Sequence, residues 1–322
     1  MYFYSPFSCD GFHSIIDKGT TMRLVTFQSD GAWRPGMLVG ETIVETQHAA
    51  QLAGLADGSD DSSRASFASN RCIIQHAPQT LQQLASAAQT LASEGRGTAL
   101  SETRLGPPIP DPEKLILIGL NYRDHAQESN QPLPQAPMVI PVYRNALAGP
   151  HDPIVLPNGH RDYVDYEGEL AIVIGRRCRN VPEEDALDCV AGAMVMNDVS
   201  ARDMQQQSPQ WAAAKMIDTF KPCGPALVLR DEIPDLENLT VITRVNGQEV
   251  QHSSTAQFIF SVRALVAYLS SFMTLEAGDI IATGTPPGVG FARKPPLFLR
   301  SGDLVEVEIA KVGMIANRVV EQ

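Results

Sequence analysis

The sequence predicts a β-rich fold of the α+β class. Short apolar runs bounded by Gly, Pro, Asn and Asp recur along the chain, as strands and turns do. The dipeptide Asn246-Gly247, inside LTVITRVNGQEVQ, is a strong short signal for a β-hairpin. No series of alternating strands and helices is visible, so the pattern does not favour a parallel sheet built from βαβ units. Strands outnumber the few helical segments, and this gives the predicted class.

The first third of the chain predicts a small domain and a linker. Residues 1–21 match no periodic pattern and lack the basic start and apolar run of a signal peptide, so we interpret them as an extension or a misassigned start. At Met22, MRLVTF begins a small β-rich N-terminal domain over 22–105. A segment rich in Gln, Leu and Ala predicts a helix around 79–93. The proline-dense GPPIPDPE predicts a linker over 106–113.

Residues 114–322 predict a second, larger domain. KLILIGL and ELAIVIG are continuous apolar runs, typical of buried strands. ESNQPLPQAP is a polar loop with prolines, of the kind that closes as a lid. PEEDALDCVAG and FIFSVRALVAYLSS predict a short and a longer helix, and GDLVEVEIAKVG predicts a half-buried strand. In the order named, these segments are 114–120, 169–175, 128–137, 182–192, 258–271 and 302–313.

The composition argues against several classes of partner. A net charge of −12 and a pI near 5.0 argue against a nucleic-acid groove or an anionic membrane surface. No run of about 18 apolar residues is present. The five cysteines are scattered and show no CxxC spacing, which argues against a disulfide framework or a zinc site. We therefore expect a cytoplasmic protein that binds a small molecule and neither nucleic acid nor membrane.

Two glutamates at i and i+2 precede the apolar run of ELAIVIG. On a strand, Glu167 and Glu169 project from the same face, so their carboxylates are close enough to share one ion. Oxygen ligands suit hard cations such as Mg²⁺, Mn²⁺ or Ca²⁺. Asp198, where an apolar run meets a loop in MVMNDVSARD, is the best candidate for a third ligand. From the spacing alone, the solvent face of an edge strand remains the alternative.

A histidine follows the buried run of KLILIGL. In GLNYRDHAQE, His125 lies three residues before Glu128, and a helix would place both side chains on one face. A carboxylate bonded to one ring nitrogen fixes the tautomer and raises the basicity of the other nitrogen, as a general base requires. The alternative is an exposed helix start with an incidental His–Glu pair.

Six motifs together resemble the fumarylacetoacetate hydrolase family. They are IGLNYRDHAQE, VDYEGELAIVIG, MNDVSARDMQ, KMIDTFKPCGP, VNGQEVQHSST and LEAGDIIATGTPPGVG, in the family's order and at similar spacings. The match runs from about residue 114 to the C-terminus, and the β-rich segment after Met22 is similar to the small N-terminal domain of many members. An ordered set of motifs is far more specific than any single one, and it favours the metal site and the general base over both alternatives.

The resemblance implies a mixed β-sandwich roll, a homodimer, and a divalent ion, Mg²⁺ or Mn²⁺ with Ca²⁺ as an alternative, in a cleft. The residues that match the family's positions are Glu167, Glu169 and Asp198 for the metal, His125, Glu128 and Lys215 for catalysis, and Arg202, Gln205, Thr219 and Thr285 for the substrate. From the residues alone, Lys215 is also compatible with a solvated charge over apolar surface, and Arg202 with a pair to Asp203. A lysine found in many members is replaced by Val142, with Arg144 as a nearby substitute.

These matches predict a metal-dependent hydrolase that cleaves a carbon–carbon bond in a 2,4-diketo acid of the acylpyruvate or fumarylpyruvate type. His125, oriented by Glu128, would activate water, and Lys215 with the cation would stabilise the enolate that leaves. The same enolate chemistry also serves an isomerase or tautomerase of an unsaturated 2-oxo or 2-hydroxy dicarboxylate, an oxaloacetate decarboxylase, or a lyase. A non-catalytic metal-binding protein is the remaining alternative, and it has no use for a base.

Overall fold

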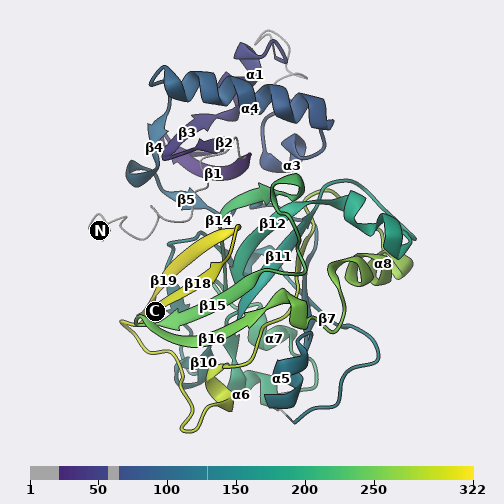
Figure 1. Ribbon diagram of the computed structural model, residues 1–322. Coiled ribbons are helices and arrows are strands. Elements are labelled where there is room, and N and C mark those ends of the chain that lie inside the picture. The colour runs from purple at the N-terminus through teal and green to yellow at the C-terminus, as the bar shows by residue number, and fades with distance from the viewer. Residues whose placement is uncertain (1–21, 57–64, 129) are drawn as a thin grey trace.

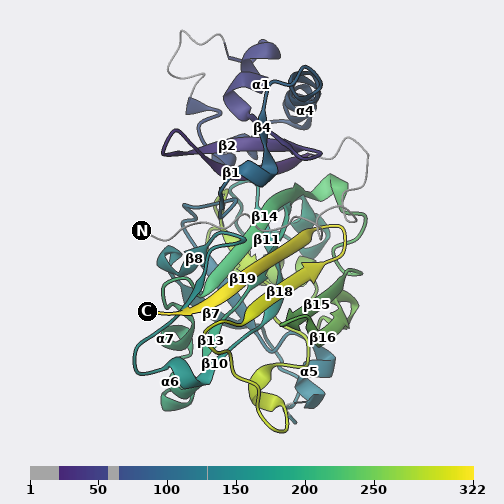
Figure 2. The same cartoon turned by 90° about the vertical axis from the view of Figure 1, so that its left-hand side faces the viewer.

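The computed structural model describes residues 22–56, 65–128 and 130–322. The interpretation of residues 1–21 as an extension therefore lies outside the described residues, as does Ser129 of the predicted lid loop. Within the described ranges the protein has a smaller unit at one end and a larger, strand-rich unit at the other (Figures 1 and 2). The predicted β-rich α+β fold is confirmed.

A mixed twelve-stranded sheet runs through both units of the described chain. Its strands are β1 (Arg23–Ser29), β2 (Ala32–Val39), β3 (Thr42–Glu45), β4 (Thr98–Ala99), β5 (Leu105–Gly106), β6 (Leu115–Gly119), β7 (Met138–Val142), β8 (Leu147–Ala148), β11 (Gly168–Ile174), β12 (Val190–Asn197), β14 (Lys221–Leu229) and β17 (Ile280–Ala282). The order is β4-β3-β2-β1-β14-β12-β11-β17-β6-β7, with β5 beside β1 and β8 beside β14. The pairs β17–β6 and β14–β8 are parallel, and the other pairs are antiparallel.

The larger unit also contains a second, five-stranded sheet. It consists of β9 (Ile154–Leu156), β15 (Thr240–Val245), β16 (Gln248–Ser254), β18 (Leu304–Ile309) and β19 (Gly313–Glu321), in the order β16-β15-β18-β19-β9. Asn246 and Gly247 join β15 to β16 with φ angles of 52° and 77°, both in the left-handed region that a two-residue hairpin turn requires. The predicted hairpin is confirmed. A short pair, β10 (Val164–Asp165) with β13 (Ser200–Ala201), completes the pairing.

In the described part of the chain, the α-helices are short apart from α4 and α8. They are α1 (Thr46–Leu52), α3 (Asn70–Ile73), α4 (Pro78–Ser93), α5 (Arg123–Glu128), α6 (Arg202–Gln207), α7 (Ala212–Lys215) and α8 (Val262–Phe272). The 3₁₀ helices are Leu100–Glu102, Arg144–Ala146, Arg161–Tyr163, Glu183–Cys189, Arg230–Glu232, Thr255–Gln257 and Gly290–Ala292. No helix of the described residues is long and apolar enough to cross a membrane.

The smaller unit consists of β1–β4 with α1 and α4 on one side (Figure 1). Pro78 begins α4, and Leu84, Ala88 and Leu91 are buried at spacings of three and four, so one stripe of the helix is covered. The helix predicted around 79–93 is confirmed. Residues 107–114 contain neither strand nor helix, yet Ile109 is fully buried there. The proline-rich segment is therefore packed against the fold.

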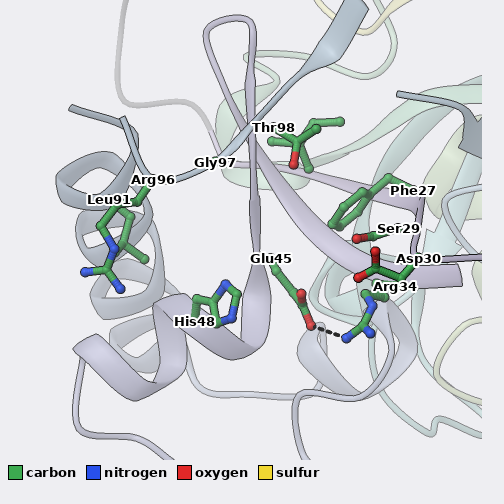
Figure 3. Close-up of a pocket in the computed structure, with 11 residues that line it drawn as sticks. Phe27, Ser29, Asp30, Arg34, Glu45, His48, Leu91, Arg96, Gly97 and Thr98 are labelled. Atoms are coloured by element: carbon green, nitrogen blue, oxygen red, sulfur yellow. Dashed lines mark hydrogen bonds and ion pairs between the residues drawn. The ribbon is translucent and has the colours of Figure 1, made fainter. Parts of the chain in front are cut away.

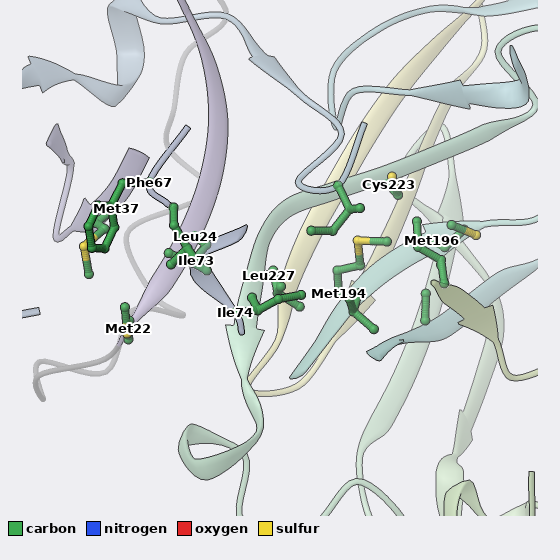
Figure 4. Packing of buried hydrophobic residues seen from close by; sticks show 14 of the residues in the cluster. Met22, Leu24, Met37, Phe67, Ile73, Ile74, Met194, Met196, Cys223 and Leu227 are labelled. Atoms are coloured by element: carbon green, nitrogen blue, oxygen red, sulfur yellow. The ribbon is translucent and has the colours of Figure 1, made fainter. Parts of the chain in front are cut away.

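The strands β11 and β12 form the centre of the larger unit. Ala171 and Val173 of β11 pack in one hydrophobic cluster, and Leu170 and Ile172 pack in another on the opposite face. Because both faces are covered, the segment is apolar without interruption. The first cluster continues from Met194 of β12 into the smaller unit (Figure 4). Residues at the ends of β11 and β12 are therefore held in place by strands that are covered on both faces.

Most predicted elements of the larger unit are found with shifted ends. The runs KLILIGL and ELAIVIG form β6 and β11, FIFSVRALVAYLSS contains all of α8 but its last residue, Phe272, and GDLVEVEIAKVG contains β18. The short helix predicted over 182–192 needs correction, because Glu183–Cys189 is a 3₁₀ helix and β12 begins at Val190. Residues 130–137, in the predicted lid loop, contain no regular element.

Candidate metal centre and active site

Three carboxylates converge at one end of the pair β11–β12. Glu169 pairs with Met196 in the antiparallel register. Two positions further along, Glu167 stands opposite Asp198, whose amide donates to the Glu167 carbonyl at 2.8 Å. Side chains alternate between faces along a strand, so the register places all three carboxylates on one face. One oxygen from each lies within 4.8 Å of the others, and all three residues are buried. Because β11 lies between β12 and β17, the edge-strand interpretation is wrong.

Two buried lysines contact this cluster. Lys215 Nζ donates to Glu167 Oε2 at 2.8 Å, to Asp198 Oδ2 at 2.6 Å and to Ser200 Oγ at 2.9 Å. Lys221 Nζ lies 2.9 Å from Asp198 Oδ1, and its side chain is fully buried. Lys215 is only 3% exposed, so the interpretation as a solvated surface charge is wrong.

Arg202 lies on the other side of Glu167. Its Nη2 is 2.7 Å from Glu167 Oε1 and 2.8 Å from Asp165 Oδ2, and its Nη1 donates to Gln205 Oε1 at 2.9 Å. The alternative that Arg202 pairs with Asp203 is wrong, because Asp203 pairs with His160 at 2.6 Å.

The electrostatics of the cluster single out Glu169. Burial raises the pKa of Glu167, but Lys215 and Arg202 outweigh it and bring the pKa to about 2. Burial raises the pKa of Glu169 well above its usual value, and the charges of Asp198 and Glu167 raise it further. Among the described residues no cationic side chain lies within ion-pair distance of Glu169, and its Oε2 accepts only from the Gly284 amide at 2.8 Å. Glu169 therefore requires either a proton or another cation.

A hard divalent cation fits this arrangement. The donor set is three carboxylates, which suits Mg²⁺ or Mn²⁺ and not a thiophilic metal. Four buried carboxylates (Asp165, Glu167, Glu169 and Asp198) meet three buried cations (Arg202, Lys215 and Lys221), which leaves one negative charge in excess when all are ionised. A dication would satisfy Glu169 and turn that excess into one positive charge, a favourable setting for a carboxylate substrate.

The predicted histidine pair forms on α5. His125 Nδ1 lies 3.1 Å from Glu128 Oε2, as the i,i+3 spacing predicts, and His125 is 8% exposed. Glu128 also accepts from the Gly288 amide through Oε1 at 2.9 Å. The carboxylate is thus held at both oxygens, and the ring is oriented. The interpretation as an exposed, incidental pair does not agree with this burial.

The two predicted threonines lie in different settings. Thr285 Oγ1 donates to the Gly168 carbonyl at 3.1 Å, directly beside Glu167 and Glu169 along the chain, and it accepts from Gln251 Nε2 at 2.8 Å. Thr219 Oγ1 accepts instead from the Val155 amide at 2.9 Å, and its φ of 68° is unusual for a β-branched residue. A contact of either hydroxyl with substrate stays a prediction.

Sequence reasoning missed Lys221, Asp165 and Gln251. The available signal for Lys221 was a lysine inside a strand-like stretch, TFKPCGP, where an unpaired charge is costly. Asp165 stands in the same VDYEGEL segment as the predicted ligands, and Gln251 follows the hairpin turn. The suggested substitute Arg144 is exposed, and Val142 packs in the hydrophobic core.

A pocket of about 530 Å³ lies in the smaller unit, and none of the three clustered carboxylates Glu167, Glu169 and Asp198 lines it (Figure 3). Phe27 and Ile43 line it together with charged side chains, of which Arg34 and Glu45 pair at 3.0 Å. Acidic and basic groups mix around its wall, so the lining favours no single ligand charge.

Comparison with known proteins agrees with the fold and the motifs. Residues 114–320 match the family model described as fumarylacetoacetate (FAA) hydrolase C-terminal. A mitochondrial oxaloacetate tautomerase of Xenopus laevis is 48% identical over 239 residues, which is 74% of this chain and 75% of that protein. A mitochondrial oxaloacetate tautomerase of Rattus norvegicus is 40% identical over 300 residues, which is 93% of this chain and 92% of that protein.

A solved structure shows the same likeness. The fumarylacetoacetate hydrolase from psychrophilic Exiguobacterium antarcticum has a TM-score of 0.76 and 31% sequence identity, covering 94% of this chain and 100% of that chain. The matched family model covers well over half of the sequence and contains every candidate site residue described above. The chain belongs to the fumarylacetoacetate hydrolase family.

Proposed function

We propose that the protein is a divalent-metal-dependent tautomerase that interconverts the enol and keto forms of a 2-oxo dicarboxylate of the oxaloacetate type. The observation that carries the proposal is the buried cluster of Glu167, Glu169 and Asp198, in which Glu169 has no cationic partner among the described residues. His125, the candidate base, lies in the same matched family region. The similarity to two oxaloacetate tautomerases, one of them over 93% of this chain, supports the choice of reaction within the family.

The chemistry follows from the charges. Tautomerisation moves one proton between the oxygen on C2 and carbon C3, and negative charge develops on the C2 oxygen in between. A bound divalent cation supplies Lewis-acid stabilisation of that charge. Lys215 adds a second positive charge, because Asp198 and Glu167 outweigh the effect of burial and keep its pKa above the usual value.

The chain itself provides a group that carries the proton. When Nδ1–H of His125 donates to Glu128, the lone pair of Nε2 is free to take a proton from the substrate and return it to a different atom. Glu128 stays fixed during the exchange, because the Gly288 amide holds its second oxygen. No water molecule is consumed and no carbon–carbon bond is broken, because the proton removed from one atom of the substrate is returned to another.

Hydrolysis of a 2,4-diketo acid is the second candidate, and the His125–Glu128 pair is the observation that favours it. A base oriented in this way also activates water. The structural likeness to a fumarylacetoacetate hydrolase supports this candidate at the level of the fold. We place it second because the relatives of higher sequence identity are named tautomerases.

The test follows the ultraviolet absorbance of enol oxaloacetate, which the keto form largely lacks, with Mg²⁺ or Mn²⁺ and with EDTA. Pyruvate release is measured in parallel from oxaloacetate, acetylpyruvate and fumarylpyruvate. We expect metal-dependent loss of the enol signal without pyruvate. Pyruvate formed from oxaloacetate as fast as the enol disappears would indicate a decarboxylase, and a higher kcat/KM for an acylpyruvate would indicate a hydrolase.

A matched pair of variants shows whether the histidine acts. His125→Asn should lose about 10²–10⁴ in rate. His252→Asn is the control, because His252 also pairs with a glutamate, Glu249, at 2.9 Å, but on an exposed part of β16. Equal loss in both variants would contradict the assignment of the base.

The cytoplasmic location and the homodimer stay predictions. The two tautomerases compared here are named mitochondrial, so fractionation of the native cells is the direct measurement of location. Light scattering on the purified protein measures the oligomeric state.

A further inference from the structure

Asp165 lies beside the metal cluster and accepts an unusually large number of hydrogen bonds for one carboxylate. Its side chain is fully buried, and it lies two positions before Glu167. Its two oxygens accept four hydrogen bonds, from the amides of Tyr166 at 2.8 Å, Gly290 at 2.7 Å and Phe291 at 3.0 Å and from Arg202 Nε at 2.9 Å. Arg202 Nη2 adds an ion-pair contact at 2.8 Å. A buried carboxylate with this many donors is a fixed point in the structure.

The guanidinium of Arg202 is held on every side. Nε and Nη2 face Asp165, Nη2 also contacts Glu167 Oε1 at 2.7 Å, and Nη1 donates to Gln205. The Phe291 ring covers its face, with the guanidinium carbon 4.5 Å from the ring centre. All three nitrogens are thus engaged, and the side chain is 5% exposed. In this arrangement Arg202 links Asp165 to Glu167 and does not present a free cation to a substrate.

The link determines which oxygen of Glu167 faces the cluster. Arg202 occupies Oε1, whereas Oε2 is the oxygen that shares Lys215 with Asp198. Nε and Nη2 both meet Asp165 Oδ2, and Nη2 also meets Glu167 Oε1, so the planar guanidinium holds one oxygen of each carboxylate in a fixed position relative to the other.

The segment around Gly290 closes on the same carboxylate. A Cβ at Gly290 would lie 2.5 Å from Asp165 Oδ1 and 1.9 Å from the Leu297 carbonyl, so only glycine permits the approach. Its neighbour Phe291 both donates to Asp165 and covers Arg202. Asp165 therefore ties this loop to the link between Arg202 and Glu167.

We propose that Asp165 is a positioning residue that sets the affinity of the centre for its divalent cation, acting through Arg202 on Glu167. It is not assigned as a ligand. Groups that orient a metal ligand typically affect metal affinity by about 10–100-fold. The inference rests on the metal-binding part of the proposed function and is independent of the reaction catalysed.

The test is a calorimetric titration of the purified protein with Mn²⁺ in the absence of substrate. Asp165→Asn keeps the shape of the side chain but replaces one oxygen by an NH₂ group, which cannot accept a hydrogen bond. In one orientation this group faces Arg202 Nε, and in the other it faces the Gly290 amide of the loop. We expect the Kd for Mn²⁺ to rise about 10–100-fold. Arg202→Lys should give a similar rise, because a single ammonium nitrogen cannot reproduce the contacts that Nε, Nη1 and Nη2 make together. In the double variant the Kd should rise by less than about threefold beyond that of either single variant, because Asp165 acts on Glu167 through Arg202.

Asp203→Asn is the matched control. Asp203 is the next residue along from Arg202, but it pairs with His160 and touches neither Arg202 nor Glu167 in the contacts above. Its Kd should stay within about twofold of wild type. Circular dichroism and the unfolding midpoint without metal identify variants that fold.

Three results would overturn the proposal: a folded Asp165→Asn with wild-type Kd, a rise of equal size in Asp203→Asn, or independent, multiplicative effects of Asp165→Asn and Arg202→Lys. If Asp165→Asn does not fold, Arg202→Lys decides, and a wild-type Kd there contradicts the proposal. Because no substrate is present, a protein without tautomerase activity that still shows the expected Kd pattern would contradict only the proposed function.

Discussion

Replacing Glu169 by Gln is expected to stabilise the metal-free protein while it removes the response to metal. Glu169 is buried beside Asp198 and Glu167 and has no cationic partner among the described residues. Glutamine has nearly the same shape, still accepts the hydrogen bond of the Gly284 amide through its oxygen, and carries no charge. The substitution therefore removes an electrostatic penalty in the absence of metal and a ligand in its presence.

The magnitude of the first effect follows from the usual pKa of 4.5 for this group. Each pKa unit corresponds to about 1.36 kcal/mol, so taking up a proton at pH 7 would cost this group about 3 kcal/mol, and the penalty for burying it cannot exceed that cost. Full relief of that cost is the upper limit, because glutamine brings a new donor that also requires a partner. We expect Glu169→Gln to raise the free energy of unfolding of the metal-free protein by about 1–3 kcal/mol.

The second effect follows from mass action. At a Mg²⁺ or Mn²⁺ concentration of about 100 times Kd, wild type should gain about 2.7 kcal/mol. For a chain of this length that gain shifts the unfolding midpoint by about 4 °C. Glu169→Gln should show a shift close to zero at the same concentration.

The assay is thermal unfolding at pH 7 followed by circular dichroism, with EDTA and with metal. Glu94→Gln is the control, since Glu94 is exposed and its partner in the described part of the chain is exposed Arg96 at 3.5 Å, and both quantities should stay near wild type. A Glu169→Gln variant that is less stable than wild type in EDTA and keeps the metal-induced shift would refute this reasoning.

Three further predictions follow from the same site. Burial, Asp198 and Glu167 raise the pKa of Glu169, so the folded metal-free protein holds a proton that the unfolded chain loses near pH 4.5. As pH increases from about 4.5 towards the raised pKa, the stability of the metal-free protein should fall and its affinity for metal should rise. Metal binding should release that proton, which calorimetry in buffers of different ionisation enthalpy measures. Asp198→Ala should lose both metal affinity and turnover, whereas His125→Ala should lose only turnover, by about 10²–10⁴; equal metal affinity in wild type and Asp198→Ala counts against the centre. Lys221→Met should lower the free energy of unfolding by roughly 3 kcal/mol in urea denaturation, because Asp198 loses one of two buried cations; an unchanged midpoint would show that the pair contributes nothing net.

The elements that depend on local pattern were predictable from the sequence. Asn246-Gly247 specifies its turn through two left-handed residues, and the two-residue period of a strand is sufficient to place Glu167 and Glu169 together. The i,i+3 spacing likewise brings His125 to Glu128. In each case the interacting residues are only a few positions apart.

Contacts that depend on strand register were not predictable from the residues alone. Asp198 was the best candidate for a third ligand because it is an acid at the end of an apolar run, but only the pairing of β11 with β12 places it opposite Glu167. Lys221 reaches Asp198 from β14, and the Gly290 amide reaches Asp165 across 125 positions of sequence. The short helix predicted at 182–192 is present, but it is a 3₁₀ helix that is shorter than predicted. Its acidic first turn is compatible with α and 3₁₀ geometry alike, and β12 takes over the chain at Val190.

Anomalous scattering from a crystal grown with Mn²⁺ is the most direct test of the account. A single strong peak surrounded by carboxylate oxygens of Glu167, Glu169 and Asp198 is the predicted result. Manganese bound elsewhere, with the Lys215 ammonium still between Glu167 and Asp198 and no density beside Glu169, would contradict it.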